Sequence, residues 1–357
     1  MTTQDYAPIT EHAEPTSRHR RTVADPVVAA AGVDGDADAA LTLAAELGSA
    51  VPSPGSGQTW TRWQLLADVS AADLTAGRVL EAHLDALAIL DEAGDATGIA
   101  AADIGVSTAS TWGVFAAEGP GVRVTAEPAG DGWLLDGTKP WCSLADRLSH
   151  GLITAHTAGG RRLFAVALDA PQVRAESTGW VSRGLSAVTS MPIHLDRAPA
   201  VPVGDDNWYL RRPGFAWGGM GVAACWYGGA VGISRRIARH FTDREPDQLG
   251  CWQLGSVDVA LHRARTVLQA AAADVDDGRA EGAAGVRLAA LVRAVVAATA
   301  EEIIGIAGHA MGPAPLTMDE DHARRIADLT VYVRQHHAER DLAAAGRALV
   351  EAGGPRW

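Results

Sequence analysis

The chain has 357 residues, 47% of them hydrophobic, and a formal net charge of −13 at pH 7. This length suffices for two or three domains with a substantial core. The acidic balance argues against a nucleic-acid-binding surface, which needs clustered cations, and no apolar run approaches the ~20 residues that a membrane span requires.

Residues 1–22 are polar and show no apolar period, which predicts a disordered tail. Their acids and prolines stand in place of a signal-peptide core, so we expect a cytoplasmic protein. From residue 23 to 105 the pattern predicts a short N-terminal helical domain. Its expected helices are the alanine-rich segment 36–47 and the segments 60–69 and 74–93, whose apolar residues recur at three-to-four spacing.

The apolar period switches to two between residues 106 and 206. Short strand candidates, separated by glycine and proline, are 112–116, 122–126, 133–135, 152–155, 163–168 and 192–195. Six short strands at this spacing predict a compact antiparallel β-barrel or sandwich domain. Within it, Asp136-Gly137 reads as a hairpin turn between two strands.

The helical period returns after Pro213-Gly214 and continues in the segment 207–357. Long helices are expected over 217–241, 253–275, 283–310 and 321–349. The short loops between them predict an antiparallel four-helix bundle. The predicted fold is therefore α+β, with helical, β-barrel and helical parts in that order.

Lys139 is the only lysine in the chain, and it lies in the decamer from Gly132 to Trp141 (GWLLDGTKPW). A lysine kept where arginine is used everywhere else suggests a function that the broad guanidinium fork of arginine cannot perform. Chance is the alternative, since a single lysine must fall somewhere.

Three segments of the β region resemble the central β-domain of the acyl-CoA dehydrogenase family. They are 132–145 (GWLLDGTKPWCSLA), 160–168 (GRRLFAVAL) and 180–203. In that family a G-x-K-x-W-[IC]-[TS] strand passes beside the flavin ring, and the order of helices, β-domain and helices is the same. The resemblance extends over residues ~55 to 350. It implies an oligomeric FAD enzyme that oxidises an acyl thioester, such as an acyl-CoA, at the α,β carbons.

The resemblance also implies which residues contact the cofactor. It places Trp141 against the isoalloxazine ring, Cys142 beside it and Ser143 near flavin N5. Gly308 and Gly312 bracket a glycine-containing turn that in the family commonly contacts the cofactor of the neighbouring subunit. The alternative for these glycines is an ordinary helix-ending turn.

Several family motifs are incomplete in this sequence. The stretch Ala117-Glu118-Gly119-Pro120 lacks the threonine and the Ser-Asp pair that usually precede the lysine-containing strand. Arg239-His240-Phe241 only echoes the motif that reaches the adenosine part of FAD across a dimer interface. These departures put the affinity for FAD in question.

The catalytic base is the largest departure. In many members it is a glutamate on the last long helix, and counting from Asp328 puts His336 at that place. The alternative glutamate position, early in the first bundle helix, falls at about Val222. His336 is thus the candidate base, since histidine can accept a proton near neutral pH. Alternatively, His336 and His337 lie on a charged helix end and form pairs with their neighbours.

Three functions remain open on these observations. The first is an acyl-CoA dehydrogenase-like enzyme with an atypical base, passing electrons to an electron-transfer partner. The second is a flavin-dependent monooxygenase or oxidase on the same fold, using oxygen. The third is a catalytically degenerate partner subunit of a homo- or hetero-oligomer. Cys142, Cys225 and Cys251 lack metal-binding spacing, so no metal site or disulfide framework is expected.

Overall fold

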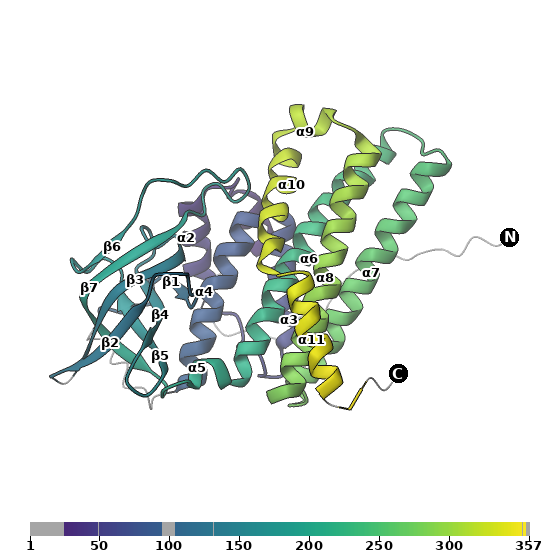
Figure 1. The fold of residues 1–357 in the computed structure, drawn as a ribbon. Helices are drawn as coiled ribbons and strands as arrows, with labels where there is room; N and C mark the ends of the chain where they lie inside the picture. The colour runs from purple at the N-terminus through teal and green to yellow at the C-terminus, as the bar shows by residue number, and fades with distance from the viewer. Residues whose placement is uncertain (1–24, 49, 95–103, 131, 352, 355–357) are drawn as a thin grey trace, which may run out of the picture.

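The computed structural model describes residues 25–48, 50–94, 104–130, 132–351 and 353–354. The predicted disordered tail, residues 1–22, lies outside this described part. A strand domain lies on one side of the molecule and a group of long helices on the other (Figure 1). The division of the chain into domains at residues 105 and 206 stays a prediction.

Four helices precede the strands. They are α1 (Pro26–Ala31), α2 (Ala37–Gly48), α3 (Thr59–Ala72) and α4 (Leu74–Ala93). Asp73 separates α3 from α4, because its extended backbone ends one helix while its carboxylate accepts a hydrogen bond from the N–H of Ala76 and caps the next. The sharp corner at Asp73 lets both helices pack against the same neighbour, α6.

The strands form a small closed barrel. They are β1 (Trp112–Phe115), β2 (Val124–Ala129), β3 (Gly132–Ser143), β4 (His150–His156), β5 (Arg161–Ala167), β6 (Val173–Ala175) and β7 (Ser190–Val203). Neighbours follow the order β1-β4-β2-β3-β7-β5, and the pairing of β5 with β4 closes the ring. The predicted barrel is confirmed, but its pairing is not purely antiparallel, since β1 and β2 both run parallel to β4. The chain reverses once at the β2–β3 hairpin and again between β3 and β4, so β4 runs in the direction of β1 and β2.

The predicted hairpin turn at Asp136-Gly137 was wrong. β3 runs through this dipeptide, and the turn lies earlier, between Ala129 and Gly132. Gly137 has φ 121°, and the pairing of β3 with β7 shifts register between Leu135 and Gly137. A Cβ atom at Gly137 would lie 2.0 Å from the carbonyl oxygen of Arg123. The glycine therefore marks a β-bulge with close backbone approach.

The C-terminal part of the chain is helical. They are α5 (Trp208–Arg211), α6 (Pro213–Thr242), α7 (Gln248–Asp276), α8 (Gly282–Met311), α9 (Ala314–Met318), α10 (Glu320–Tyr332) and α11 (Glu339–Glu351). α6 contacts α3, α4, α7, α8 and α10, which makes it the central helix of the molecule. α8 is long and apolar enough to cross a membrane by length and composition, contrary to our expectation, although core helices of bundles pass the same test.

The last predicted helix, 321–349, is broken in two. After α10 the chain makes a single 3-10 turn, Val333–Gln335, and His336 is extended with φ −87° and ψ 123°. Ala338 then has a positive φ of 47°, and α11 begins at Glu339. No glycine or proline marks this break, so the periodicity did not reveal it.

Candidate functional site

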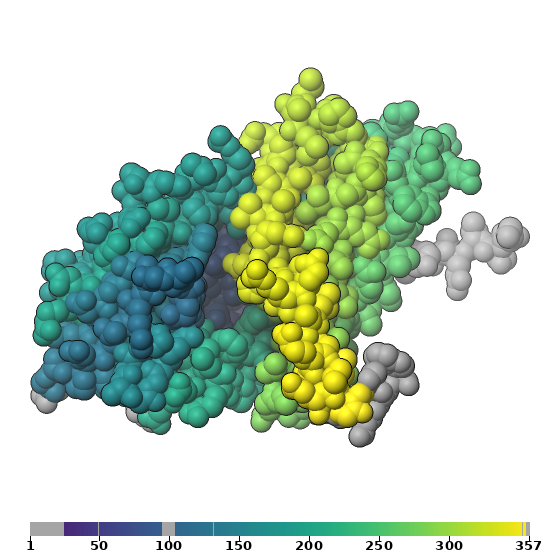
Figure 2. Space-filling model, viewed as in Figure 1, coloured from purple at the N-terminus to yellow at the C-terminus, as the bar shows by residue number. Residues whose placement is uncertain are grey.

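A groove lies between the barrel and the helices. Figure 2 shows a hollow between the barrel and the C-terminal helices, with the N-terminal helices at its floor. The residues that line the groove come from α4 and the barrel region. Its lining includes Arg78 and Ala82 from α4, Val114 and Phe115 from β1, and Ser143 and Leu148 after the bend of β3. The groove holds about 320 Å³ of space outside the protein atoms, part of it open to solvent.

The bend that ends β3 brings Ser143 to this groove. Trp141 and Leu144 both have positive φ values, 61° and 56°, and the register with β7 shifts between Lys139 and Cys142. The hydroxyl of Ser143 lies 2.8 Å from that of Ser190 and accepts a hydrogen bond of 3.3 Å from Nη2 of Arg78. A hydroxyl and a cation therefore meet on the wall of the groove.

The other predicted cofactor residues lie elsewhere. Trp141 is 65% exposed and does not line the groove. Cys142 is buried, and this burial raises the pKa of its thiol to about 12, which keeps the thiol neutral. Gly308 lies in the last turn of α8 and Gly312 caps it, next to α9 and away from the barrel (Figure 1). Among the predicted cofactor residues, Ser143 alone lines the groove.

Lys139 has a structural role, because its side chain links separate segments of the barrel. Its buried Nζ donates to Oε1 of Glu118 at 2.9 Å, and to the carbonyl and hydroxyl oxygens of Thr154 at 2.9 and 2.8 Å. A compact ammonium suits three acceptors converging on one point better than a planar fork does. The lone lysine thus joins β3 to β4 and to the segment after β1.

A polar stripe on α4 leads away from the groove. Arg78, Glu81 and Asp85 follow one another at helical spacing and face the bundle. Oε2 of Glu81 accepts from Nη1 of Arg78 at 3.2 Å and from the hydroxyl of Tyr332 at 3.3 Å. Burial raises the pKa of Glu81 to about 7, against the opposing effect of Arg78. Glu81 was not predicted from the sequence, although charged residues at this spacing on an otherwise apolar helix are visible there.

Glu81 also lines a second crevice on its other side. This crevice, of about 250 Å³ including space open to solvent, lies between α3, α4 and α6. Arg62 and Trp63 come from α3, Trp217 and Gly218 from α6. The groove and the crevice are therefore connected through hydrogen-bonded side chains, from Ser143 through Arg78 to Glu81.

His336 lies near this network without lining either hollow. The break after α10 turns it inward, where it is 9% exposed and meets the ring of Trp226 edge-on at 6.4 Å between centroids. Its Nε2 has no hydrogen-bond partner among the described residues and lies 3.9 Å from Oδ2 of Asp341. Burial lowers the pKa of His336, which favours the neutral ring. Its role as base stays a prediction.

Comparisons with known proteins identify the fold. No family model and no curated protein matches the chain. KijD3, solved with FMN and a dTDP-3-amino-4-keto sugar, is 22% identical, with a TM-score of 0.74 over 93% of this chain and 91% of that chain. Glutaryl-CoA dehydrogenase from Mycobacterium smegmatis is 19% identical, with a TM-score of 0.70 over 86% and 85%. TdsC from a Paenibacillus species, solved with FMN and indole, is 17% identical, with a TM-score of 0.72 over 92% and 98%. The chain has the acyl-CoA dehydrogenase fold, as its motifs predicted.

Proposed function

We propose that this protein is a flavin-dependent oxidoreductase that binds the flavin ring in the groove between barrel and helices. The observation that carries the proposal is the hydrogen-bonded series from Ser143 in the groove through Arg78 to the buried carboxyl of Glu81. Flavins named in the structures of KijD3 and TdsC support a flavin in this fold. When bound, a flavin accepts electrons from a substrate and passes them on.

The groove suits a planar ring. Its lining combines apolar side chains with a few polar groups, as the lining of ligand sites commonly does. Val114, Phe115 and Leu148 offer apolar walls, and Ser143 and Arg78 offer donors. These residues would hold the part common to FMN and FAD. We infer that FMN suffices, since the motif that would reach the adenosine of FAD is incomplete here.

Different side chains would have different roles in the reaction. Arg78 supplies a positive charge that stabilises negative charge on the ring system, and the hydroxyl of Ser143 can donate to the same edge. Glu81 is the proton acceptor, because a carboxyl with a pKa of about 7 takes up and releases protons near neutral pH. Tyr332 holds the Glu81 carboxyl in place by donating to Oε2.

Two reactions fit this arrangement. In the first, Glu81 would replace the family glutamate and take up the α-proton of an acyl thioester, and a bound flavin would supply the acceptor for the β-hydrogen, which leaves as hydride. In the second, the enzyme is a monooxygenase or oxidase. The charged lining of the second crevice favours this reaction, because a bound acyl chain would need an apolar channel. The electron acceptor is then oxygen in place of an electron-transfer protein.

Absorbance spectroscopy of the flavin-loaded protein tests both readings. We expect FMN to bind with a perturbed visible spectrum and to bind more weakly to Ser143→Ala. Anaerobic bleaching by butyryl-CoA would identify a dehydrogenase. Oxygen uptake by the reduced protein without such bleaching would identify an oxygen-using enzyme. A protein that binds neither FMN nor FAD would contradict the proposal and favour a degenerate partner subunit.

We further propose a cytoplasmic oligomer. The exposed face of α7 carries Leu249, Trp252 and Val259, which are large apolar residues at helical spacing. An apolar helix face of this kind is a candidate subunit interface. A second subunit could also supply contacts to the outer part of the flavin.

A further inference from the structure

Arg62 is a buried cation with few partners. It lies on α3, is 6% exposed and lines the second crevice. A guanidinium has five N–H donors, and Arg62 makes a single hydrogen bond with the described residues, from Nη1 to the carbonyl oxygen of Pro52 at 3.1 Å. It forms no ion pair with the described residues, although the carboxyl groups of Glu81 and Asp85 line the same crevice and attract it electrostatically. Burial lowers the pKa of Arg62, which reflects the cost of holding this charge away from water.

The other arginines near the crevice have carboxylate, carbonyl or aromatic partners, although Nε of Arg212 has no hydrogen-bond partner among the described residues. Arg78 pairs with Glu81 at 3.2 Å. Arg212 pairs with Glu92 at 2.5 Å. Arg293 donates to two backbone carbonyl groups and lies 4.7 Å from the ring centroid of Trp226. Arg62 is therefore the cation whose remaining donors are free to meet a ligand.

We propose that the second crevice binds a carboxylate group of the substrate and that Arg62 is its anchor. The inference rests on the proposed flavin chemistry and names the substrate class for it. Arginine recognises carboxylates through paired, charge-assisted hydrogen bonds. The indoles of Trp63 and Trp217 form apolar walls of the crevice. A Cβ atom at Gly221 would have its nearest neighbour at 3.7 Å, whereas the carboxylate of Asp85 lies over Gly218.

The carboxyl of Glu81 gives this site a pH dependence. Charged or titratable groups face it from every helix around it: Arg62, Arg78, Asp85, Cys225, Arg293 and Tyr332. A bound carboxylate is repelled by ionised Glu81 and tolerated by the protonated form. Ligand affinity should therefore fall as the pH rises through about 7, where Glu81 ionises.

Calorimetry with three ligands that share one ring tests the proposal on the full chain. We expect benzoate to bind at least about tenfold more tightly than benzamide or benzylammonium, because only benzoate offers a charged acceptor. R62Q should lose about tenfold or more of the benzoate affinity, and R62K should lose less. Arg279→Gln, which removes an exposed arginine, is the matched control and should bind benzoate as the wild type does.

Two results would overturn the inference. One is tighter binding of benzylammonium than of benzoate by the wild-type protein, a comparison that needs no variant to fold. The other is unchanged benzoate affinity in folded R62Q. E81Q should bind benzoate with an affinity that falls less with pH, since Asp85, whose pKa burial also raises, still lines the crevice. An unchanged slope would count against the site. FMN binding, measured on the same proteins, should be unaffected by R62Q. A failure of FMN to bind would therefore be seen separately from a failure of the carboxylate site.

Discussion

A carboxyl group buried between an arginine and a tyrosine titrates differently from one in water. Glu81 has an ordinary pKa of 4.5 that burial raises to about 7. Because the folded-state pKa is the higher one, its contribution to stability is complete below pH 4.5 and is lost as the pH rises through 7. This loss amounts to the order of 3 kcal/mol.

Glu81→Gln should therefore flatten the pH dependence of stability. We expect the free energy of unfolding of the wild type to fall between pH 5 and 8, and that of the variant to fall less. Part of the slope should remain, because burial also raises the pKa of Asp328, to about 6. Urea unfolding at the two pH values measures the effect. Equal slopes in the two proteins would show that Glu81 ionises normally in the fold.

The lone lysine permits a second prediction at this scale. Lys139→Arg should lower the free energy of unfolding by about 1–3 kcal/mol, because a guanidinium overfills the site and cannot meet three converging acceptors. Thermal and urea unfolding measure the change. The reverse exchange at an exposed position, Arg123→Lys, is the control and should leave stability unchanged. An arginine tolerated at 139 without loss would mean that the site is not selective for lysine.

Sequence patterns located some of these residues and not others. The family strand motif led to Ser143, and composition alone drew attention to Lys139. Glu81 was missed because a helical pattern shows which residues share a face but not what covers that face. Its role depends on Tyr332, which is 251 positions away in the chain. Pairings of such separation are set by tertiary packing.

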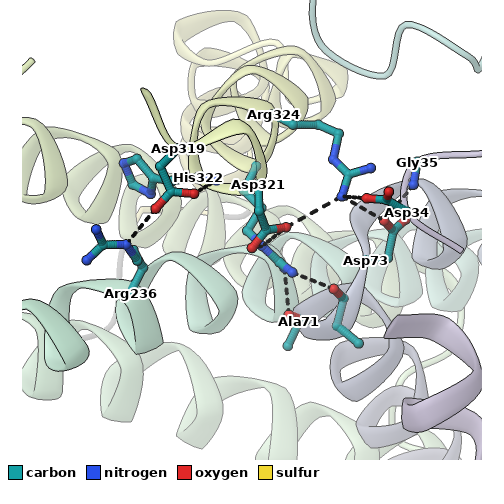
Figure 3. Close-up of polar contacts among 11 residues, drawn as sticks. Asp34, Gly35, Ala71, Asp73, Arg236, Asp319, Asp321, His322 and Arg324 are labelled. Carbon is teal, nitrogen blue, oxygen red and sulfur yellow. Dashed lines mark hydrogen bonds and ion pairs between the residues drawn. The ribbon is translucent and has the colours of Figure 1, made fainter. Parts of the chain in front are cut away.

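At the scale of elements, α10 is held against the corner between α3 and α4. Figure 3 shows Arg324 facing Asp34 and Asp73, with Nη2 of Arg324 2.9 Å and 3.6 Å from their carboxylate oxygens. At the start of the same helix, Asp319 accepts from Nε of Arg236 on α6 at 2.9 Å and from the N–H of His322 at 3.1 Å. These contacts fix the helix whose other end carries the Tyr332 hydroxyl.

Arg325 makes the contact whose removal should matter most for α10. It donates to the carbonyl oxygens of Ala71 and Ala72 at 2.8 and 2.6 Å, which caps the C-terminal end of α3 with a cation. Arg325→Ala should lower the free energy of unfolding by about 1.5–3 kcal/mol. Amides of α10 should exchange hydrogen faster, and those of α7 should not. Arg279→Ala serves as control, and equal exchange of α10 in wild type and variant would refute the assignment.

Helices were predicted more accurately than their interruption or the strand pairing. The segment 74–93 coincides with α4, because its N-cap and its apolar spacing are local signals. The break at His336 has no such local signal, and the contact that His336 makes there is with Trp226, far away in the sequence. The direction of β1 relative to β4 likewise depends on how the hairpin between them lies in space.

At the scale of the whole molecule, the apolar face of α7 predicts self-association. Trp252 is 63% exposed, and Leu249 and Val259 lie beside it in the helical repeat. Trp252→Glu should shift the protein from an oligomer to a single chain in light scattering, because burying a charge in an apolar interface is costly. Val181→Glu, at an exposed site between β6 and β7, should leave the mass unchanged. A wild-type protein that is already monomeric would contradict the proposal.

The central claim is that the groove between the barrel and the helices binds the flavin ring. Its most direct test is the affinity for FMN of the wild type and of Ala82→Trp, whose indole would fill the groove from α4. Ala238→Trp, an exposed site on α6, is the matched control. We predict stoichiometric FMN binding by the wild type and the control, and a loss of about tenfold or more in folded Ala82→Trp. Binding of FMN to Ala82→Trp with wild-type affinity, or no binding of FMN or FAD to the wild type, would contradict the account.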